Sequence, residues 1–349
     1  MTLRLTIEGR IYEGWIKAKV DRGLDQFANR FSLNYLDSWT SEQKPWPIRS
    51  RTPAVLSWGS EVLIDGYVDR PRHKVDADSW RLEADGRSRT GQLVDCSAIH
   101  DTGHWNNKTA LQIVSDICEP FGIAVTTNVI DFEPFNRFTL QEGETAFDAI
   151  DRICKIRALL PRTTPGGLQL FSTDVPGAVI PLDVSRAVSR EYEDDSTKRY
   201  SDYLVRATGV GSAAEAFSKA VAKDTGVEIF RPLVVVGDAP ARTKQAKQRA
   251  IWEANVRSGR GERLTYHYLS PLNKLGKTYA PGQFYKVVDD LFGVDEIMIV
   301  QHATLVVDEN NIDTQIDLVR PGAYSRFEYD AKRLVKKTKK PKRTRRGSL

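Results

Sequence analysis

Short runs of alternating apolar and polar residues, about ten residues apart, constrain the fold of this chain more than any other feature. Leu3, Leu5 and Ile7 alternate with polar residues, and a similar run begins at Phe31. A period of two is typical of strands that are buried on one face, and short strands at this spacing favour an antiparallel sandwich or barrel. We therefore predict an all-β first domain over residues 1–97.

The pattern becomes helical after the first domain. Apolar residues at i, i+3, i+4 and i+7 predict a helix over 110–121, capped by Asn107 or Thr109, and a second helix from about Thr145. Both segments begin with Thr-Ala and carry Ile-Cys eight residues later. This likeness is either a small helix–strand repeat or a chance agreement between two amphipathic helices. We predict an α+β domain over residues 98–183.

Strand patterns return in the last third of the chain. They predict a second β-domain formed by residues 184–210 together with 262–328. The alanine-rich stretch 211–261 is predicted to be a helical insertion in it, with a helix from Ala241 through Val256. The predicted fold class is therefore α+β, mostly antiparallel β, with two barrel or sandwich domains and an α+β domain between them.

Composition narrows the class of protein. Apolar residues make up 40% and charged residues 28% of the chain, which is typical of soluble globular proteins. No apolar run approaches the roughly 20 residues that a membrane helix needs, and no secretory segment is recognisable at the start. Cys96, Cys118 and Cys154 have no metal-binding spacing, so we expect reduced thiols, two of them in helices.

Charge is distributed unevenly along the chain. Residues 1–330 hold 41 basic and 46 acidic residues, and the stretch 331–349 holds ten basic residues and no acidic one. We predict a flexible basic tail over 331–349. The partner-binding candidates in this tail are Lys336, Lys337, Lys339, Lys340, Lys342, Arg343, Arg345 and Arg346.

Histidines and carboxylates form no convincing catalytic or metal site in the sequence. His100 and His104 have the spacing of a zinc pair, but Gly103 lies between them and the glutamate of the zinc-protease motif is absent. The carboxylates of Glu191–Asp195 are interpreted as a solvated loop at the end of a strand, and Asp308–Asp313 as a hairpin turn. Gly209-Val210-Gly211 lacks the third glycine of a dinucleotide-binding motif. We predict no catalytic residue, cofactor or metal.

Three stretches together resemble the baseplate hub proteins of Mu-like contractile-tailed phages. They are the turn and strand Leu63–Asp69, the run Gly86–Ala98, and the C-terminal run from Tyr279–Gly282 through Val319–Tyr324. The resemblance covers about residues 1–328, in order.

This resemblance implies a structural protein of the virion rather than an enzyme. Hubs of this family are homotrimers in which the two β-domains of each chain resemble tail-tube subunits, so that three chains present six similar domains. The hub is then a symmetry adapter between the sixfold tail tube and the threefold central spike, with a channel for DNA, and is similar to the central hub of T-even phages. The implied partners are further copies of the chain, the tail tube protein, the spike protein and other baseplate proteins. The resemblance also implies assembly in the host cytoplasm.

Two other functions are possible besides that of a hub: a tail-associated protein that binds nucleic acid through its basic tail, and a peptidoglycan hydrolase. The basic tail is either simply solvated, or attracted to nucleic acid or to an acidic protein surface. It has no aromatic residue after Tyr329, so binding to nucleic acid involves phosphates and is sensitive to salt. A tail-associated peptidoglycan hydrolase is the third possibility, which the lack of a paired acid and base argues against.

Overall fold

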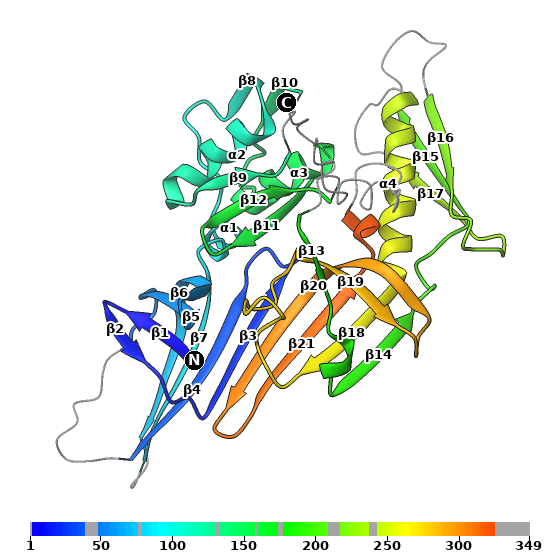
Figure 1. Ribbon diagram of the computed structural model, residues 1–349. Helices are drawn as coiled ribbons and strands as arrows, with labels where there is room; N and C mark the ends of the chain where they lie inside the picture. The colour runs from blue at the N-terminus through cyan, green and yellow to red at the C-terminus, as the bar shows by residue number, and fades with distance from the viewer. Residues whose placement is uncertain are drawn as a thin grey trace, which may run out of the picture.

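The fold is mostly antiparallel β, as predicted. The computed structural model describes residues 2–38, 48–75, 79–129, 133–157, 159–173, 177–208, 217–236 and 243–324. Figure 1 shows a long sheet with two smaller layers standing over one end of its strands. The predicted basic tail lies outside the described residues.

One 13-stranded sheet contains strands from both ends of the chain. Its first seven strands are β1 (Leu3–Ile7), β2 (Arg10–Tyr12), β3 (Lys17–Gly23), β4 (Arg30–Ser38), β5 (Pro53–Trp58), β6 (Glu61–Val75) and β7 (Ser79–Ser88). The other six are β13 (Val179–Pro181), β14 (Ser189–Asp194), β18 (Glu262–Tyr268), β19 (Phe284–Asp289), β20 (Val294–Asp308) and β21 (Ile312–Val319). Short 3-10 turns lie at Val184–Arg186 and Pro321–Tyr324.

The two halves of this sheet have the same strand order. The first half reads β3-β4-β7-β6-β5-β1, and the second reads β14-β18-β21-β20-β19-β13. If the six strands of each half are numbered in the order in which the chain forms them, leaving out β2, both halves have the spatial order second, third, sixth, fifth, fourth, first. β2 is an addition to the first half. The first strand also differs in direction, because β1 is antiparallel to β5 whereas β13 is parallel to β19.

The long fifth strand of each half carries an irregularity at the same place. In β6 the register shifts between Val68 and Arg70, and in β20 it shifts between Val300 and His302. Before the shift, each fifth strand pairs with the fourth strand of its half. Beyond the shift that pairing stops, and the sixth strand is its only remaining neighbour from the same half. A bulge of this kind bends a strand and ends pairing on one side.

The halves join through β3 and β20, which are antiparallel over seven residue pairs from Lys17–Asp308 to Gly23–His302. The sheet is open at β14 and at β2, and no barrel closes among the described strands. The prediction of barrels therefore needs correction. The edge of β20 beyond its bulge pairs with the other half instead of closing its own.

The α+β middle part contains both predicted helices. Its elements are α1 (Gly91–Asp95), β8 (His104–Lys108), α2 (Ala110–Cys118), a 3-10 turn (Glu119–Phe121), β9 (Val125–Thr127), β10 (Phe135–Thr139), α3 (Ala146–Arg157), β11 (Leu160–Thr164) and β12 (Gly167–Phe171). Thr109 caps α2 in a reciprocal capping box with Gln112. Cys118 and Cys154 are buried between the helices, and all three cysteines are free thiols, as predicted.

The predicted helical insertion also contains strands. Besides α4 (Thr243–Gly261), it contains β16 (Phe217–Lys223) and β17 (Pro232–Val236), and both pair with β15 (Asp202–Thr208). β15 was expected in the second β-domain. It joins the separate sheet because Val205 and Ala220 form a small core with Ala246 and Ala250 of α4.

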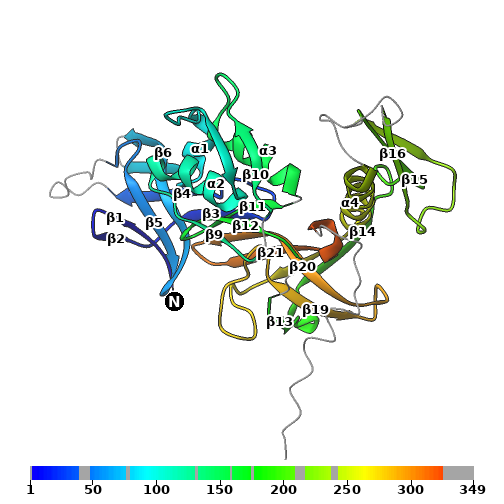
Figure 2. The same cartoon turned by 90° about the horizontal axis from the view of Figure 1, so that it is seen from above.

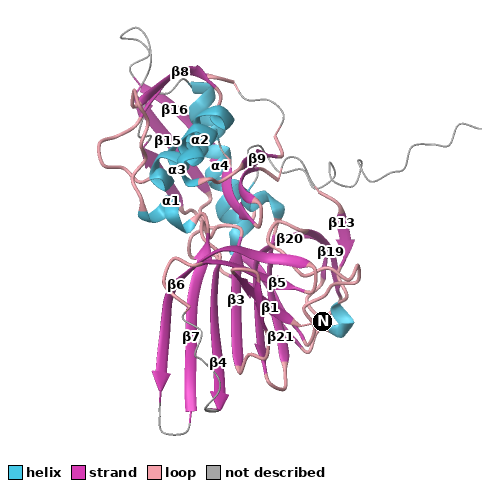
Figure 3. Cartoon of the chain, turned by 90° about the vertical axis from the view of Figure 1, so that its left-hand side faces the viewer, coloured by secondary structure: helices cyan, strands magenta, loops and turns pink. Residues whose placement is uncertain are grey.

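Each part has a core, and a further buried cluster that contains Leu24, Phe171 and Phe284 joins the middle part to both halves of the sheet. The middle part and the insertion lie over the same end of the long sheet (Figure 1, Figure 3). Seen from above, the middle part lies beside the first half and the insertion beside the second (Figure 2). In the described part of the chain, no helix is both long and apolar enough to cross a bilayer.

Candidate interaction site

The β3–β20 junction shows how one half of the sheet binds the other. Val20 of β3 lies opposite Leu305 of β20, and both are buried in the core of the first half. Next to them, the Thr304 hydroxyl donates to the Asp21 carboxylate at 2.9 Å. The junction therefore combines backbone pairing, an apolar contact and a polar contact on the opposite face.

A second polar cluster lies at the end of this junction. His302 Nε2 is 3.0 Å from the carboxylate of Asp25, to which Gln301 Nε2 also donates at 3.0 Å. Burial alone raises the pKa of Asp25, but the hydrogen bonds from His302 and Gln301 outweigh it and lower that pKa to about 2. The hydrogen bond to Asp25 raises the pKa of His302, against the opposing effect of burial.

The Asp25–His302 pair should make the stability of the junction depend on pH. Because the folded-state pKa of His302 is raised above 6.5, its contribution is complete below pH 6.5 and is lost as the pH rises through that pKa. Because the pKa of Asp25 is lowered from 3.8 to about 2, its contribution is lost only as the pH falls below 3.8. His302→Gln should therefore destabilise the chain at pH 6 more than at pH 9, as measured by urea unfolding. His104→Gln is the control, and equal losses for His302→Gln at both pH values would contradict the assignment.

The short strands β2 and β13 have open outer edges, and two longer strand edges of the sheet also have no described strand beside them. One is the outer edge of β14, where the path of the sheet ends, and all six residues of β14 are exposed. The other is the outer edge of β6 between Arg70 and Val75, beyond the bulge. Figure 1 shows β14 at the end of the second half, and Figure 3 shows β6 on the outside of the first half. Open strand edges are templates for pairing with another chain.

Charged residues cover both edges. Arg70, Arg72 and Lys74 alternate along β6 and are exposed, and Arg72 pairs with Glu83 of β7 at 3.1 Å. On β14, Glu193 pairs with Arg263 of β18. The carboxylates from Glu191 to Asp194, interpreted from the sequence as a solvated loop at the end of a strand, thus form a paired strand at the edge of the sheet.

The other candidates take structural roles. The ring of His100 stacks on Trp105 with centroids 4.2 Å apart, and His104 Nδ1 is 2.8 Å from the Thr102 carbonyl oxygen. Asp308 accepts from the backbone N–H groups of Asn310 and Asn311 in the β20–β21 hairpin, which confirms the predicted turn. Among the described residues, no cluster of three or more potential metal ligands occurs. The tail candidates and Gly209-Val210-Gly211 lie outside the described residues.

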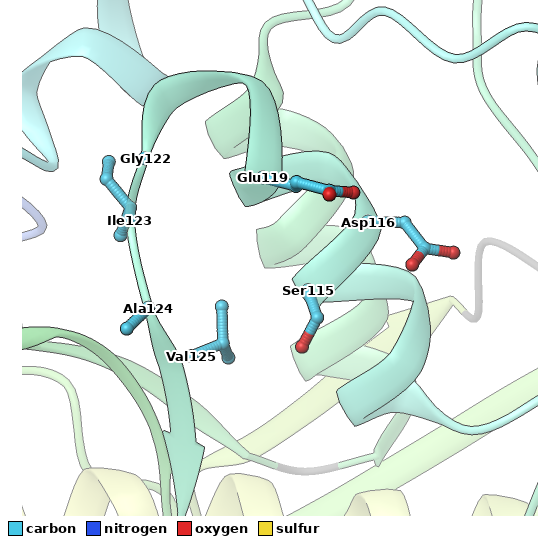
Figure 4. A pocket seen from close by; sticks show the side chains of 7 residues that line it. All are labelled: Ser115, Asp116, Glu119, Gly122, Ile123, Ala124 and Val125. Atoms are coloured by element: carbon cyan, nitrogen blue, oxygen red, sulfur yellow. The ribbon is translucent and has the colours of Figure 1, made fainter.

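A hollow of about 360 Å³ lies between the end of α2 and the strand β9. Ser115, Asp116 and Glu119 line the helix side of it, but the two carboxylates point away from Ile123 and Val125 (Figure 4). Asp116 instead accepts from the indole N–H of Trp105 at 2.9 Å. A ligand site needs a few polar groups that converge on the cavity, and this hollow lacks them.

The sequence did not predict the open edges of β6 and β14 or the Asp25–His302 cluster. The sequence signal that could have indicated the two edges is like charge at every second residue. One segment has Arg70, Arg72 and Lys74, and the other has Glu191 and Glu193. Alternation of like charges on one face of a strand is typical of an exposed edge. Which strands lie next to these segments depends on distant pairings that no local pattern contains.

Comparisons with known proteins agree with this architecture. Residues 2–88 match the family model of the Mu phage baseplate assembly protein GpP-like N-terminal domain, and residues 90–172 match that of the baseplate hub protein gp44-like second domain. Baseplate hub protein gp44 of Escherichia phage Mu is 27% identical over 348 residues, covering 95% of this chain and 91% of that protein.

Two solved tail proteins have similar structures. The 43 kDa tail protein of prophage MuSo2 from Shewanella oneidensis has a TM-score of 0.82 at 26% identity, covering 93% of this chain and 99% of the other. The tail protein from Neisseria meningitidis MC58 has a TM-score of 0.79 at 20% identity, covering 94% and 99%. The chain is therefore similar to the Mu-like phage baseplate hub proteins over nearly its whole length, and these relatives are structural proteins of the tail rather than enzymes.

Proposed function

We propose that three copies of this hub protein form a ring that adapts the sixfold tail tube to the threefold central spike. The observation that supports it most is the repeated strand order of the sheet, β3-β4-β7-β6-β5-β1 and β14-β18-β21-β20-β19-β13. A chain with two similar units presents six of them as a trimer. One face of the ring then meets six tube subunits, and the other meets three spike chains.

The two β-units of this proposal are tail-tube-like. The first comprises residues 1–97 with the α+β domain 98–183 following it. The second comprises 184–210 and 262–328, interrupted by 211–261, except that β15 belongs to the sheet of the insertion and that β13 joins the second unit. Within a unit the sheet is open, and neighbouring units complete it. The partners are other copies of the chain, the tube protein, the spike protein and other baseplate proteins, assembled in the host cytoplasm before tail contraction and ejection.

The mass of the protein in solution tests the trimer. One chain has a mass of 39.3 kDa, so light scattering on a size-exclusion column should give three times that value. A monomer at every concentration up to that used for electron microscopy would contradict the proposed function. Incubation with cell-wall substrate should give no clearing, because the hub has no hydrolytic role.

The charge of the chain suits a channel for DNA. Residues 1–330 hold five more acidic than basic residues, so a ring of them repels phosphates and lets the genome pass without binding. The basic tail has the opposite sign. We assign its eight candidates, Lys336, Lys337, Lys339, Lys340, Lys342, Arg343, Arg345 and Arg346, to an acidic surface of a neighbouring tail protein.

Removal of residues 331–349 tests the role of the tail. The truncated protein should remain a trimer but bind its tail partner more weakly, and the difference should shrink as salt is raised because salt screens the attraction. Pull-down of tube or spike protein at two salt concentrations measures this. Equal binding by both proteins would contradict the assignment. Binding to DNA that is steeply salt-dependent and vanishes on truncation would instead favour nucleic acid as the target.

A further inference from the structure

The two halves of the sheet have the same strand order, so the β3–β20 junction has an equivalent pair of strands that do not meet within the chain. Within the chain, the fifth strand of the second half, β20, pairs with the second strand of the first half, β3. The equivalent strands in the opposite combination are β6 and β14, and both have an open edge. We propose that β14 of one chain pairs with the outer edge of β6 of the next chain, and that this contact closes the ring. The inference rests on the proposed trimer and specifies its interface.

The bulges fix which residues of the fifth strands correspond. Val68 of β6 and Val300 of β20 both precede the shift in register, and each lies opposite a residue of the sixth strand of its half. Four residues further along, Arg72 therefore occupies the position of Thr304. Arg70 and Lys74 lie on the same face as Arg72, because side chains two apart in a strand share a face.

The second strands can be aligned in the same way. In the first half, Arg87 of the sixth strand lies opposite Arg30 of the third strand, which lies opposite Asp21. In the second half, the equivalent residues are Val319, Arg263 and Glu193. Glu193 of β14 therefore holds the position that Asp21 holds in β3. Thr304 lies opposite Asp21 in the junction within the chain. In the junction between chains, Arg72 therefore lies opposite Glu193.

The same register pairs the neighbouring charges. Lys74 lies opposite Glu191, and Arg70 lies opposite Asp195, which directly follows β14. Three basic residues on one edge thus meet three acidic residues on the other, position by position. A slip of one residue would turn these side chains to opposite faces and lose every pair, so the charges specify the register.

The existing ion pairs continue this pattern across four strands. Glu83 of β7 pairs with Arg72 of β6, and Glu193 of β14 pairs with Arg263 of β18. When the edges meet, charges alternate from Glu83 through Arg72 and Glu193 to Arg263. Opposite charges that face each other across strands stabilise a sheet, and like charges destabilise it.

Both edges have features of strands that pair outside the chain. All six residues of β14 are exposed, including Tyr192, which stacks on Phe292 with centroids 5.8 Å apart. Pro71 of β6 has no N–H group, which suits a strand edge that is open within the chain, and in the proposed pairing it leaves one ladder hydrogen bond unformed. The contact is between different surfaces of identical chains. Such contacts form a closed ring when the rotation that relates one chain to the next adds up to a full turn.

Charge reversal tests this pairing. The variant Arg72→Glu/Lys74→Glu should dissociate into monomers at a protein concentration at least about tenfold higher than the wild type, because two attractions per interface become repulsions. Glu191→Lys/Glu193→Lys should do the same. The combination of all four substitutions should restore most of the stability of the trimer, since each pair between chains is again attractive, while Glu83 and Arg263 face like charges within each chain. Light scattering over a dilution series gives the mass.

Two matched substitutions away from both edges serve as controls. Lys219→Glu and Glu309→Lys each reverse one exposed charge, as each single substitution of the edge variants does, and should leave the trimer unchanged. If the wild type is a trimer and either one-sided variant dissociates no more readily, the pairing is wrong although the proposed function stands. Failure of the four-fold variant to recover would also overturn the register. A monomeric wild type contradicts the proposed function itself.

A cysteine pair gives a test that does not depend on electrostatics. Residues directly opposite in an antiparallel pair have Cα atoms about 4.5–5.5 Å apart, which suits a disulfide. In a Cys96→Ser background, Arg72→Cys with Glu193→Cys should form covalent trimers on oxidation. Arg72→Cys with Glu309→Cys should not. Absence of cross-links in a wild-type-like trimer would overturn the proposal.

Discussion

Gly66→Ala is expected to destabilise the protein by about 3–5 kcal/mol, a large share of the roughly 5–15 kcal/mol by which an ordinary protein is stable. Gly66 is buried in β6, where a Cβ atom would lie 1.9 Å from the backbone carbonyl oxygen of Arg87. Backbone in the middle of a sheet cannot move away without breaking its pairing. The same crowding affects Gly86 of β7, where a Cβ atom would lie 2.2 Å from the ring of Phe31.

The free energy of unfolding, from urea titration followed by circular dichroism, measures this effect. Gly166→Ala is the matched control, because a Cβ atom there meets no atom within 4 Å. It should change stability by less than about 0.5 kcal/mol. A Gly66→Ala protein as stable as the wild type would show that β6 and β7 do not approach each other as described.

Leu305→Ala should destabilise the protein by about 2–5 kcal/mol, the usual cost of removing a buried leucine side chain. Leu305 belongs to β20 in the second half, but its side chain is 3% exposed and lies in the core of the first half, opposite Val20. Its loss leaves a cavity at the junction. Because the residue connects the halves, we expect both to unfold together at a lower urea concentration.

Leu291→Ala provides the comparison for this variant. Leu291 is 68% exposed, so the same truncation should cost less than about 0.5 kcal/mol. Tryptophan fluorescence and circular dichroism should report one coincident transition for Leu305→Ala. Separate transitions, or stability equal to that of Leu291→Ala, would contradict a single sheet joined through β3 and β20.

Local features of the fold could be predicted from the sequence. The alternation at Leu3, Leu5 and Ile7 gave β1, and the stripe after Thr109 gave α2 with the cap that the structure shows. Two glycines of the stretches that resemble the family, Gly66 and Gly86, have a physical explanation in the close approach of neighbouring strands.

Distant pairings could not be predicted. The contact between Thr304 and Asp21 joins residues 283 positions apart, and nothing in either segment specifies the other. β15 was placed in the wrong sheet for the same reason, because its alternation shows that it is a strand but not which strands pair with it. The sequence predicts a strand as far as Tyr192 and a solvated loop after it, but pairing with β18 extends the strand to Asp194.

The account depends most on the claim that each chain contributes two similar units to one ring. Averaged electron micrographs of the purified trimer, viewed along its axis and processed without imposed symmetry, test it directly. We predict a closed ring of six similar lobes whose alternate members differ slightly, with a central opening. A particle with three lobes, or an open chain of subunits, would contradict the account.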